Sequence, residues 1–217
     1  MIMVNILSTG NSLLHHFVAE LRDVEIQNDR MRFRRNLERI GEIAAYEISK
    51  TMIYENTDVT TPLGIATVPL MQSQPVLGTI LRAGLPLHQG LLNYFDQADN
   101  AFISAYRRHH KDGSFDIHLQ YLSSPPIAGR VLILSDPMLA TGQSLVETYK
   151  AMLESGQPAH THVVAAIASR QGIEYVKANL PDDLTIWVAA VDEELTAQSY
   201  IVPGLGDAGD LAFGEKK

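Results

Sequence analysis

Hydrophobic positions in the first quarter of the chain repeat at helical spacing. Between Asp29 and Met52 the apolar residues recur every three or four positions, at Phe33, Leu37, Ile40, Ala44, Ile48 and Met52. A repeat of this length places them on one face of a helix, so the pattern predicts an amphipathic helix over Asp29–Met52. A shorter helical stretch is expected before it, from about Ser12 to Leu21.

From Leu63 onward the pattern changes to short apolar runs, several of them almost continuously apolar, as in strands buried on both faces. Helical stretches lie between some of the runs, and this alternation predicts an α/β fold with a mainly parallel central sheet flanked by helices. Strands are expected at Leu63–Val68, Val76–Leu81, Ala101–Tyr106, Val131–Leu134, Val163–Ala168 and Leu184–Val191. Helices are expected at Leu85–Phe95, Ser144–Ser155 and Ile173–Asn179.

Composition narrows the class of protein. The 217 residues contain no internal repeat or linker, which predicts a single domain over residues 1–217. A formal net charge of −8 disfavours nucleic acid as a partner. The absence of cysteine excludes disulfides, thiolate metal sites and cysteine nucleophiles. No apolar run approaches the ~18 residues of a membrane span, and no signal-peptide pattern is present, so we expect a cytoplasmic location and no membrane partner.

One strand–helix junction has the chemistry of an anion site. The strand Val131–Leu134 leads to Asp136, and the segment Ala140–Ser144 then opens a predicted helix with small residues. Gly142 allows unusual backbone angles, hydroxyl groups add donors, and a helix N-terminus attracts negative charge. The segment therefore suits a sugar phosphate, with Asp136 accepting from ribose hydroxyls. A plain turn with a capping serine is the competing interpretation of the loop alone.

Two cationic segments follow other predicted strands. Arg82-Ala83-Gly84 comes after Leu81, and the most basic run of the chain, Tyr106–Lys111, precedes a turn and a possible second arm at Phe115–Leu122. A hairpin tipped with cations suits a lid over a pyrophosphate. Both segments are also compatible with ordinary surface charge. The adjacent His109 and His110 do not indicate a metal, because neighbours in a strand point to opposite faces.

The C-terminal segment Tyr200–Asp210 is rich in glycine. Its glycines fit G-x-G-x-x-G, but only 8 residues follow Gly209, too few for the helix and strand of a dinucleotide site. Exposed main-chain groups can instead match the alternating acceptors and ring N–H of a pyrimidine-2,4-dione. Cytosine reverses the polarity at two of these positions, which leaves buried groups unpaired and costs affinity.

Together these segments resemble the uracil phosphoribosyltransferases, a branch of the type I phosphoribosyltransferases. The resemblance covers nearly the whole chain and rests on Leu81–Leu85, Tyr106-Arg107, Asp136–Ser144 and Tyr200–Asp210. It implies the type I fold, with N-terminal helices, a β-hairpin lid and a C-terminal hood loop. It also implies transfer of 5-phosphoribosyl from phosphoribosyl pyrophosphate to N1 of uracil, giving UMP and pyrophosphate in pyrimidine salvage, with Mg²⁺ as cofactor.

The resemblance assigns roles to named residues. Arg82, Asp136 and Asp207 are implied as catalytic, with Arg82 and Arg107 on the diphosphate. The magnesium is held mainly by phosphoribosyl pyrophosphate, with Asp136 or Asp207 as its candidate protein contacts and no direct side-chain cluster. The implied contacts of the ribose and 5-phosphate are Asp136, Pro137, Met138, Leu139, Ala140, Thr141, Gly142, Gln143 and Ser144, with Asp207 facing the diphosphate. The implied uracil contacts are Ile201, Gly206, Asp207 and Ala208.

Several features depart from the family pattern or stay open. Ser135 replaces an aliphatic residue, Gln143 replaces a glycine, Ser169–Gly172 replaces Ala-Pro-Glu-Gly, and residues 107–126 diverge most. Family members are dimers or larger and some respond to GTP; the sequence decides neither property here. A purine or orotate phosphoribosyltransferase is one rival, which the hood disfavours. An RNA-binding nucleotide sensor is the other, which the acidic balance disfavours.

Overall fold

A central sheet of eight strands organises the computed structural model, which describes residues 2–109 and 115–216 and no side chain between 105 and 119. The strand order is β1-β10-β9-β7-β4-β5-β6, with β8 also paired to β9. All neighbours are parallel except β5 and β6. The sheet strands are β1 (Met3–Ile6), β4 (Val76–Leu81), β5 (Asp99–His109), β6 (Phe115–Ser123), β7 (Val131–Ser135), β8 (Met138–Leu139), β9 (His160–Ser169) and β10 (Leu184–Asp192).

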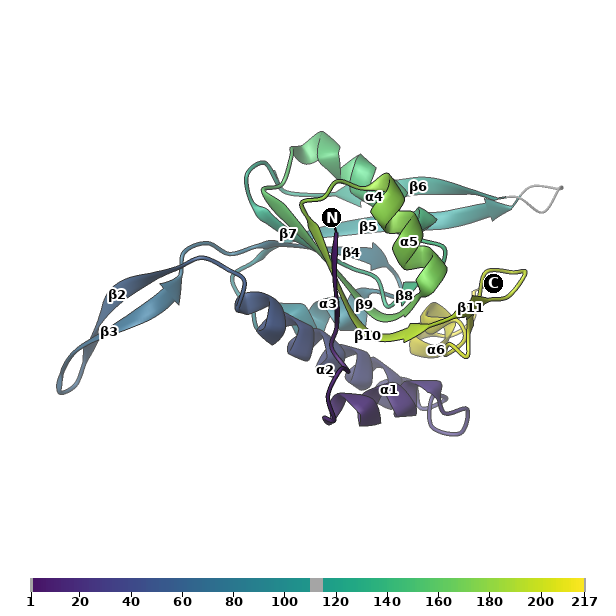
Figure 1. Cartoon of the computed structure of the whole chain (residues 1–217), viewed down its shortest axis with the longest axis horizontal. Coiled ribbons are helices and arrows are strands. Elements are labelled where there is room, and N and C mark those ends of the chain that lie inside the picture. Colours follow the sequence, from purple (N-terminus) through teal and green to yellow (C-terminus); the bar gives the residue numbers. More distant parts are fainter. Residues whose placement is uncertain (1, 110–114, 217) are drawn as a thin grey trace.

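Helices cover both faces of this sheet, which confirms the predicted α/β class (Figure 1). One face packs against α1 (Leu14–Arg22), α2 (Arg30–Ser49), α3 (Leu85–Leu92) and α6 (Ala208–Phe213). The other packs against α4 (Gln143–Met152), which ends in a short 3-10 turn (Leu153–Ser155), and α5 (Arg170–Asn179). Side chains of a strand alternate between the two layers: in β4, Val76 faces α4 and Leu77 faces α2.

Helix α2 confirms the amphipathic pattern but is shorter than predicted. Asp29 caps it by accepting hydrogen bonds from the N–H groups of Met31 and Arg32. The apolar face from Phe33 to Ile48 is buried, whereas Met52 lies past the helix end at Ser49. Apolar spacing alone does not show where the last helical hydrogen bond forms, so the predicted end is three residues late.

A strand does form over most of the predicted stretch Leu63–Val68, but its expected place in the central sheet is wrong. The chain forms a two-stranded hairpin, β2 (Tyr54–Thr61) and β3 (Gly64–Met71), which pairs with no other strand in the described part of the chain. Figure 1 shows this hairpin projecting away from the sheet and its helices. Its apolar residues are largely exposed, including Leu63 at the turn and Ile65. The short strand β1 was not predicted; it adds to the edge of the sheet beside β10.

The antiparallel pair β5 and β6 forms the two arms of the predicted hairpin. Arg107 lies in β5 opposite Ile117 in β6, and its side chain is outside the described part of the structure. The expected turn at Asp112-Gly113 also lies outside the described residues. The C-terminal hood has more regular secondary structure than the predicted loop. Its strand β12 (Ile201–Val202) pairs with β11 (Glu194–Leu195), which precedes the hood, and helix α6 then follows.

Candidate active site

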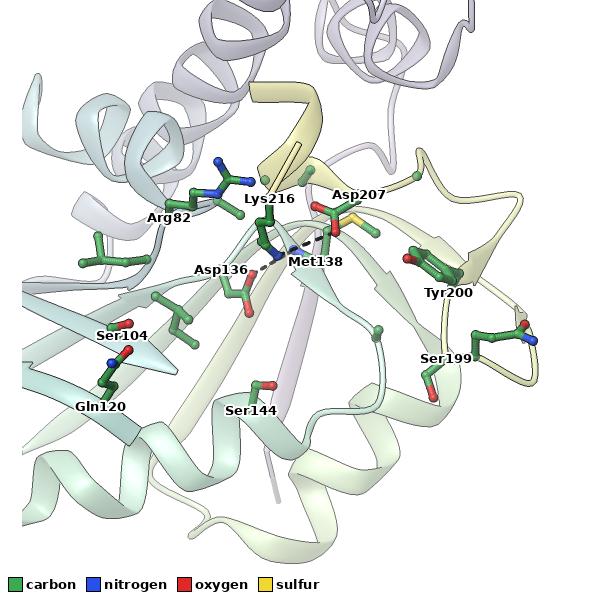
Figure 2. A pocket seen from close by; sticks show the side chains of 18 residues that line it. Arg82, Ser104, Gln120, Asp136, Met138, Ser144, Ser199, Tyr200, Asp207 and Lys216 are labelled. Atoms are coloured by element: carbon green, nitrogen blue, oxygen red, sulfur yellow. Dashed lines mark hydrogen bonds and ion pairs between the residues drawn. The ribbon is translucent and has the colours of Figure 1, made fainter. Parts of the chain in front are cut away.

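A cavity of about 1020 Å³ lies between the carboxyl ends of the sheet strands and the hood. Parallel pairing aligns Thr79 of β4 with Ser135 of β7, so the residues after both strands emerge at one edge. Figure 2 shows Arg82, Asp207 and Lys216 on one side of the cavity, with Ser104, Gln120 and Ser144 across from them. The lining contains these predicted residues: Arg82, Asp136, Met138, Ala140, Ser144, Gly206, Asp207 and Ala208.

The remaining predicted residues lie around this cavity. Leu139, Thr141 and Gly142 line a small recess that shares Asp136, Met138, Ala140 and Ser144 with it. Pro137, Gln143 and Ile201 line neither space. Ile201 is buried within the hood, and the carbonyl of Pro137 accepts hydrogen bonds from β9. Gln143 is the first residue of helix α4.

Sequence reasoning missed part of the lining. Ser104 and Gln120 come from the facing strands β5 and β6, Gln198 and Ser199 come from the segment before the hood motif, and Lys216 comes from the C-terminal tail. No motif marks these residues in the sequence. Only the register of the β5–β6 pair and the return of the tail over the cavity bring them to the site.

The phosphate loop has the backbone that the sequence predicts. Gly142 has φ +81°, and a Cβ built there would lie 2.8 Å from the carbonyl oxygen of Gly172. Helix α4 begins at Gln143, and its first turn borders the recess next to the loop. The N–H of Gln143 donates to the Thr141 hydroxyl at 3.4 Å, and the other N–H groups in the first turn of a helix have no partner within the helix. The carboxylate of Asp136 accepts a hydrogen bond from the N–H of Met138 at 3.2 Å. This arrangement offers main-chain donors to an anion beside a fixed carboxylate.

The departure at Ser169 supports the phosphate loop. The Ser169 hydroxyl donates to the carbonyl oxygen of Ala140 at 2.5 Å and accepts from the N–H of Gly172 at 2.8 Å. Ser169 is fully buried and caps α5. A Cβ at Gly172 would collide with the same Ala140 carbonyl. The start of α5 therefore packs directly against the loop and fixes its backbone.

Ser135, which also departs from the family pattern, forms a hydrogen bond through its side chain. Ser135 is fully buried, and its hydroxyl donates to the carbonyl oxygen of Gly78 on the neighbouring strand β4 at 3.1 Å. A buried hydroxyl with a partner is tolerated in a core. The polar side chain thus links the two strands that carry Asp136 and Arg82.

Arg82 follows β4 and reaches the hood. Its Nη2 donates to Asp210 Oδ1 at 2.5 Å. The turn after Arg82 is tightly packed, because a Cβ at Gly84 would collide with the side chain of Thr79. The Leu81–Arg82 peptide bond is cis.

An ion pair beneath the hood anchors its glycine-rich segment. Both Nη atoms of Arg22 donate to the Asp192 carboxylate at 2.8 Å, and Asp192 also accepts from the N–H of Gly204 at 3.0 Å. Arg22 additionally donates to the Gly204 carbonyl at 2.9 Å. Two-pronged pairs between arginine and a carboxylate fix direction as well as distance. Helix α1 and strand β10 therefore hold the hood at Gly204.

The hood ends in a capped helix above the cavity. Asp207 Oδ1 accepts from the N–H of Asp210 at 3.0 Å and so caps α6. Lys216 Nζ lies 3.9 Å from the other carboxylate oxygen of Asp207. Arg34 of α2 donates to the carbonyl of Ala212 at 2.8 Å, which holds α6 against the N-terminal helices.

Among the described residues, no group of three His, Cys, Asp or Glu side chains could hold a metal ion. The carboxylates that line the cavity, Asp136 and Asp207, come from separate elements. A cation in this cavity would therefore need ligands from a bound substrate as well. In the same part of the chain, no helix is long and apolar enough to cross a membrane.

Known proteins share both the sequence and this architecture. The family model for uracil phosphoribosyltransferase matches residues 8–215. A uracil phosphoribosyltransferase of Porphyromonas gingivalis is 58% identical over 210 residues, which cover 97% of each protein. The solved structure of the AQ2163 protein from Aquifex aeolicus has a TM-score of 0.86 at 29% identity and covers 98% of both chains.

A hypoxanthine phosphoribosyltransferase of Staphylococcus aureus shows a more distant likeness. It has a TM-score of 0.50 at 15% identity and covers 85% of this chain and 83% of its own, so it supports the fold alone. The match over almost the entire length and the high identity to the P. gingivalis relative decide the family. The chain therefore belongs to the uracil phosphoribosyltransferase family and has the α/β fold of the type I phosphoribosyltransferases.

Proposed function

We propose that this protein transfers the 5-phosphoribosyl group of phosphoribosyl pyrophosphate to N1 of uracil, giving UMP and pyrophosphate. One observation carries the proposal. A phosphate-type loop at the end of β7 and a glycine-rich hood both line the same cavity. A two-substrate transfer needs this arrangement, because the sugar phosphate and the base must meet in one enclosed space.

The two substrates divide the cavity between them. The main-chain N–H groups at the start of α4 and the hydroxyls of Thr141 and Ser144 suit the 5-phosphate, and the Asp136 carboxylate suits the ribose hydroxyls. Main-chain groups of Gly206 and Ala208 suit the carbonyls and N–H of uracil. Arg82 suits the diphosphate, because a guanidinium can engage two phosphate oxygens at once. Arg107 on β5 is proposed as a second diphosphate contact.

The chemistry follows from where charge develops. The bond from ribose C1 to the pyrophosphate oxygen breaks, its electron pair leaves with pyrophosphate, and uracil N1 forms the new bond to C1 as its proton is released. Positive charge grows on the ribose ring and negative charge on the leaving group. Arg82 stabilises the leaving group, and the loop and hood hold the reactants in line. Each such effect supplies a few kcal/mol.

A magnesium ion fits this site as a companion of the substrate. The cavity offers two separated carboxylates, Asp136 and Asp207, and oxygen donors are the ligands that Mg²⁺ prefers. These residues would complete the shell of an ion carried mainly by the diphosphate. When bound, the ion supplies neutralisation of the diphosphate charge.

The projecting hairpin supports a homo-oligomer. Leu63 is fully exposed and Ile65 is 72% exposed, on a two-stranded unit that no other strand of the described residues joins. Isolated hairpins are marginally stable in water, and exposed apolar residues mark contact surfaces. We propose that a second copy of the chain covers this hairpin. Regulation by GTP, the single domain and the cytoplasmic location stay predictions.

A panel of bases tests the proposed reaction. The protein is incubated with phosphoribosyl pyrophosphate, Mg²⁺ and one of uracil, cytosine, orotate or hypoxanthine, and nucleotide formation is measured. Uracil alone should give a nucleotide, because the other bases present different edges to the hood. Turnover of a purine without uracil contradicts the proposal. Tight RNA binding with no turnover of any base would favour the nucleotide-sensing rival.

A further inference from the structure

Asp210 connects the hood to the loop after β4. It lies in the first turn of α6 on the hood, and its partner Arg82 lies on the loop after β4. The ion pair has a 2.5 Å separation, and about a third of each side chain is exposed. It therefore joins the region proposed for the diphosphate to the region proposed for uracil.

The surroundings of this pair are closely packed. The main-chain N–H of Asp210 donates to Asp207, so both groups of Asp210 are engaged. A Cβ built on Gly209 would lie 3.2 Å from Asp207 Oδ1 and 3.8 Å from Arg82 Nε. The guanidinium, the Asp207 carboxylate and the first turn of α6 therefore form one compact group.

Arg82 keeps donors for a substrate in this arrangement. The hydrogen bond to Asp210 uses Nη2, while the buried Nε has no hydrogen-bond partner among the described residues. A guanidinium has five N–H donors in a rigid fork. Because the guanidinium is planar and rigid, a carboxylate that holds Nη2 also sets the direction of the remaining N–H groups. Fixing a long side chain before the ligand arrives reduces the entropy lost on binding.

We infer that Asp210 is a positioning residue, which holds the Arg82 guanidinium in the orientation that meets the departing diphosphate. The inference rests on the proposed role of Arg82 as a diphosphate contact. Asp210 acts through Arg82 and touches neither substrate. Because Asp210 belongs to α6 of the hood, it also makes the orientation of Arg82 depend on the position of the hood.

Steady-state kinetics of Asp210→Ala and Asp210→Asn test the inference. The alanine variant should lose about 10-fold or more in kcat/KM for phosphoribosyl pyrophosphate, as misdirected groups do. The asparagine variant should lose less, since its amide oxygen can still accept from Nη2. KM for uracil at saturating phosphoribosyl pyrophosphate should stay within about twofold, because affinity for the base comes from the hood main chain.

Asp96→Asn is the matched control. Asp96 is an exposed carboxylate in the loop between α3 and β5, so this variant makes the same change of charge away from the cavity. It should keep the kinetics of the unmodified protein. Thermal unfolding of all three variants shows whether a kinetic loss comes from a misdirected Arg82 or from a less stable fold. Asp210→Asn and Asp96→Asn should have similar melting temperatures.

A double-mutant cycle with Arg82→Lys decides whether Asp210 acts through Arg82. Lysine lacks the fork, so Asp210→Ala should cost much less in the Arg82→Lys background than in the unmodified protein. An equal loss in both backgrounds, or unchanged or improved kinetics of Asp210→Ala, overturns the inference alone. Full activity of Arg82→Lys by itself would instead overturn the proposed role of Arg82.

Discussion

Replacing Gly142 by alanine tests whether the phosphate loop depends on its backbone. Two costs add at this position. The residue has φ +81°, a region that costs an L-residue roughly 1–2 kcal/mol. The new Cβ would also lie 2.8 Å from the Gly172 carbonyl oxygen, which belongs to the rigid start of α5. Overpacking of this kind costs about 1–3 kcal/mol, so the total loss of stability should be roughly 2–5 kcal/mol.

Gly129→Ala separates the two costs. Gly129 has φ +70°, but a Cβ built on it would meet no atom of residues 2–109 or 115–216 within 4 Å. This control should lose only the backbone contribution of roughly 1–2 kcal/mol. Urea unfolding followed by linear extrapolation gives both values. Gly142→Ala should also raise KM for phosphoribosyl pyrophosphate at least about 10-fold, whereas Gly129→Ala should leave it unchanged. Equal losses of stability and unchanged kinetics in both variants would show that the loop does not depend on Gly142.

Three further variants or conditions extend these tests. Ser169→Ala should destabilise the protein by about 1–3 kcal/mol, because it removes the α5 cap and leaves the Ala140 carbonyl without its partner; an unchanged melting temperature would contradict this. Asp207→Ala should lower kcat about 100-fold but lower the free energy of unfolding by only about 1 kcal/mol. The control Asp29→Ala, which removes the cap of α2, should lower stability alone. Parallel losses of activity and stability in Asp207→Ala would argue against a role at the substrate. Burial lowers the pKa of His162 to about 3, below its ordinary unfolded value of about 6.5. The contribution of neutral His162 to the free energy of unfolding is therefore complete above pH 6.5 and falls as the pH drops below it, by about 1 kcal/mol at pH 5.5. In urea unfolding measured at several pH values, His162→Asn should lose less stability on acidification than the unmodified protein, and an equal loss in both would exclude His162 as the source.

The sheet and the phosphate loop could be predicted from the sequence because both leave strong local signals. Val76–Leu81 is almost continuously apolar and forms β4 at the predicted residues. The small-residue loop predicts an unusual backbone conformation at Gly142, and its positive φ and close approach to Gly172 agree. In both cases a physical requirement of the fold restricts the residue type at the position itself.

The parts that could not be predicted depend on distant partners. Strand β2 is exposed along its whole length, so no burial pattern marks it. Arg22 looks like an ordinary surface residue of a helix, but it pairs with Asp192, 170 positions away, and holds the hood. Lys216 reaches the cavity only because α6 turns the tail back over it. Such contacts are set by the tertiary fold and leave no trace in local spacing.

A crystal structure with UMP bound would decide whether the loop and the hood form one two-substrate site. We expect the 5-phosphate on the main-chain N–H groups between Thr141 and Ser144, the ribose hydroxyls at Asp136, and the uracil ring against Gly206–Ala208. UMP bound outside this cavity, or with its base at the α4 N-terminus and its phosphate under the hood, would contradict this assignment.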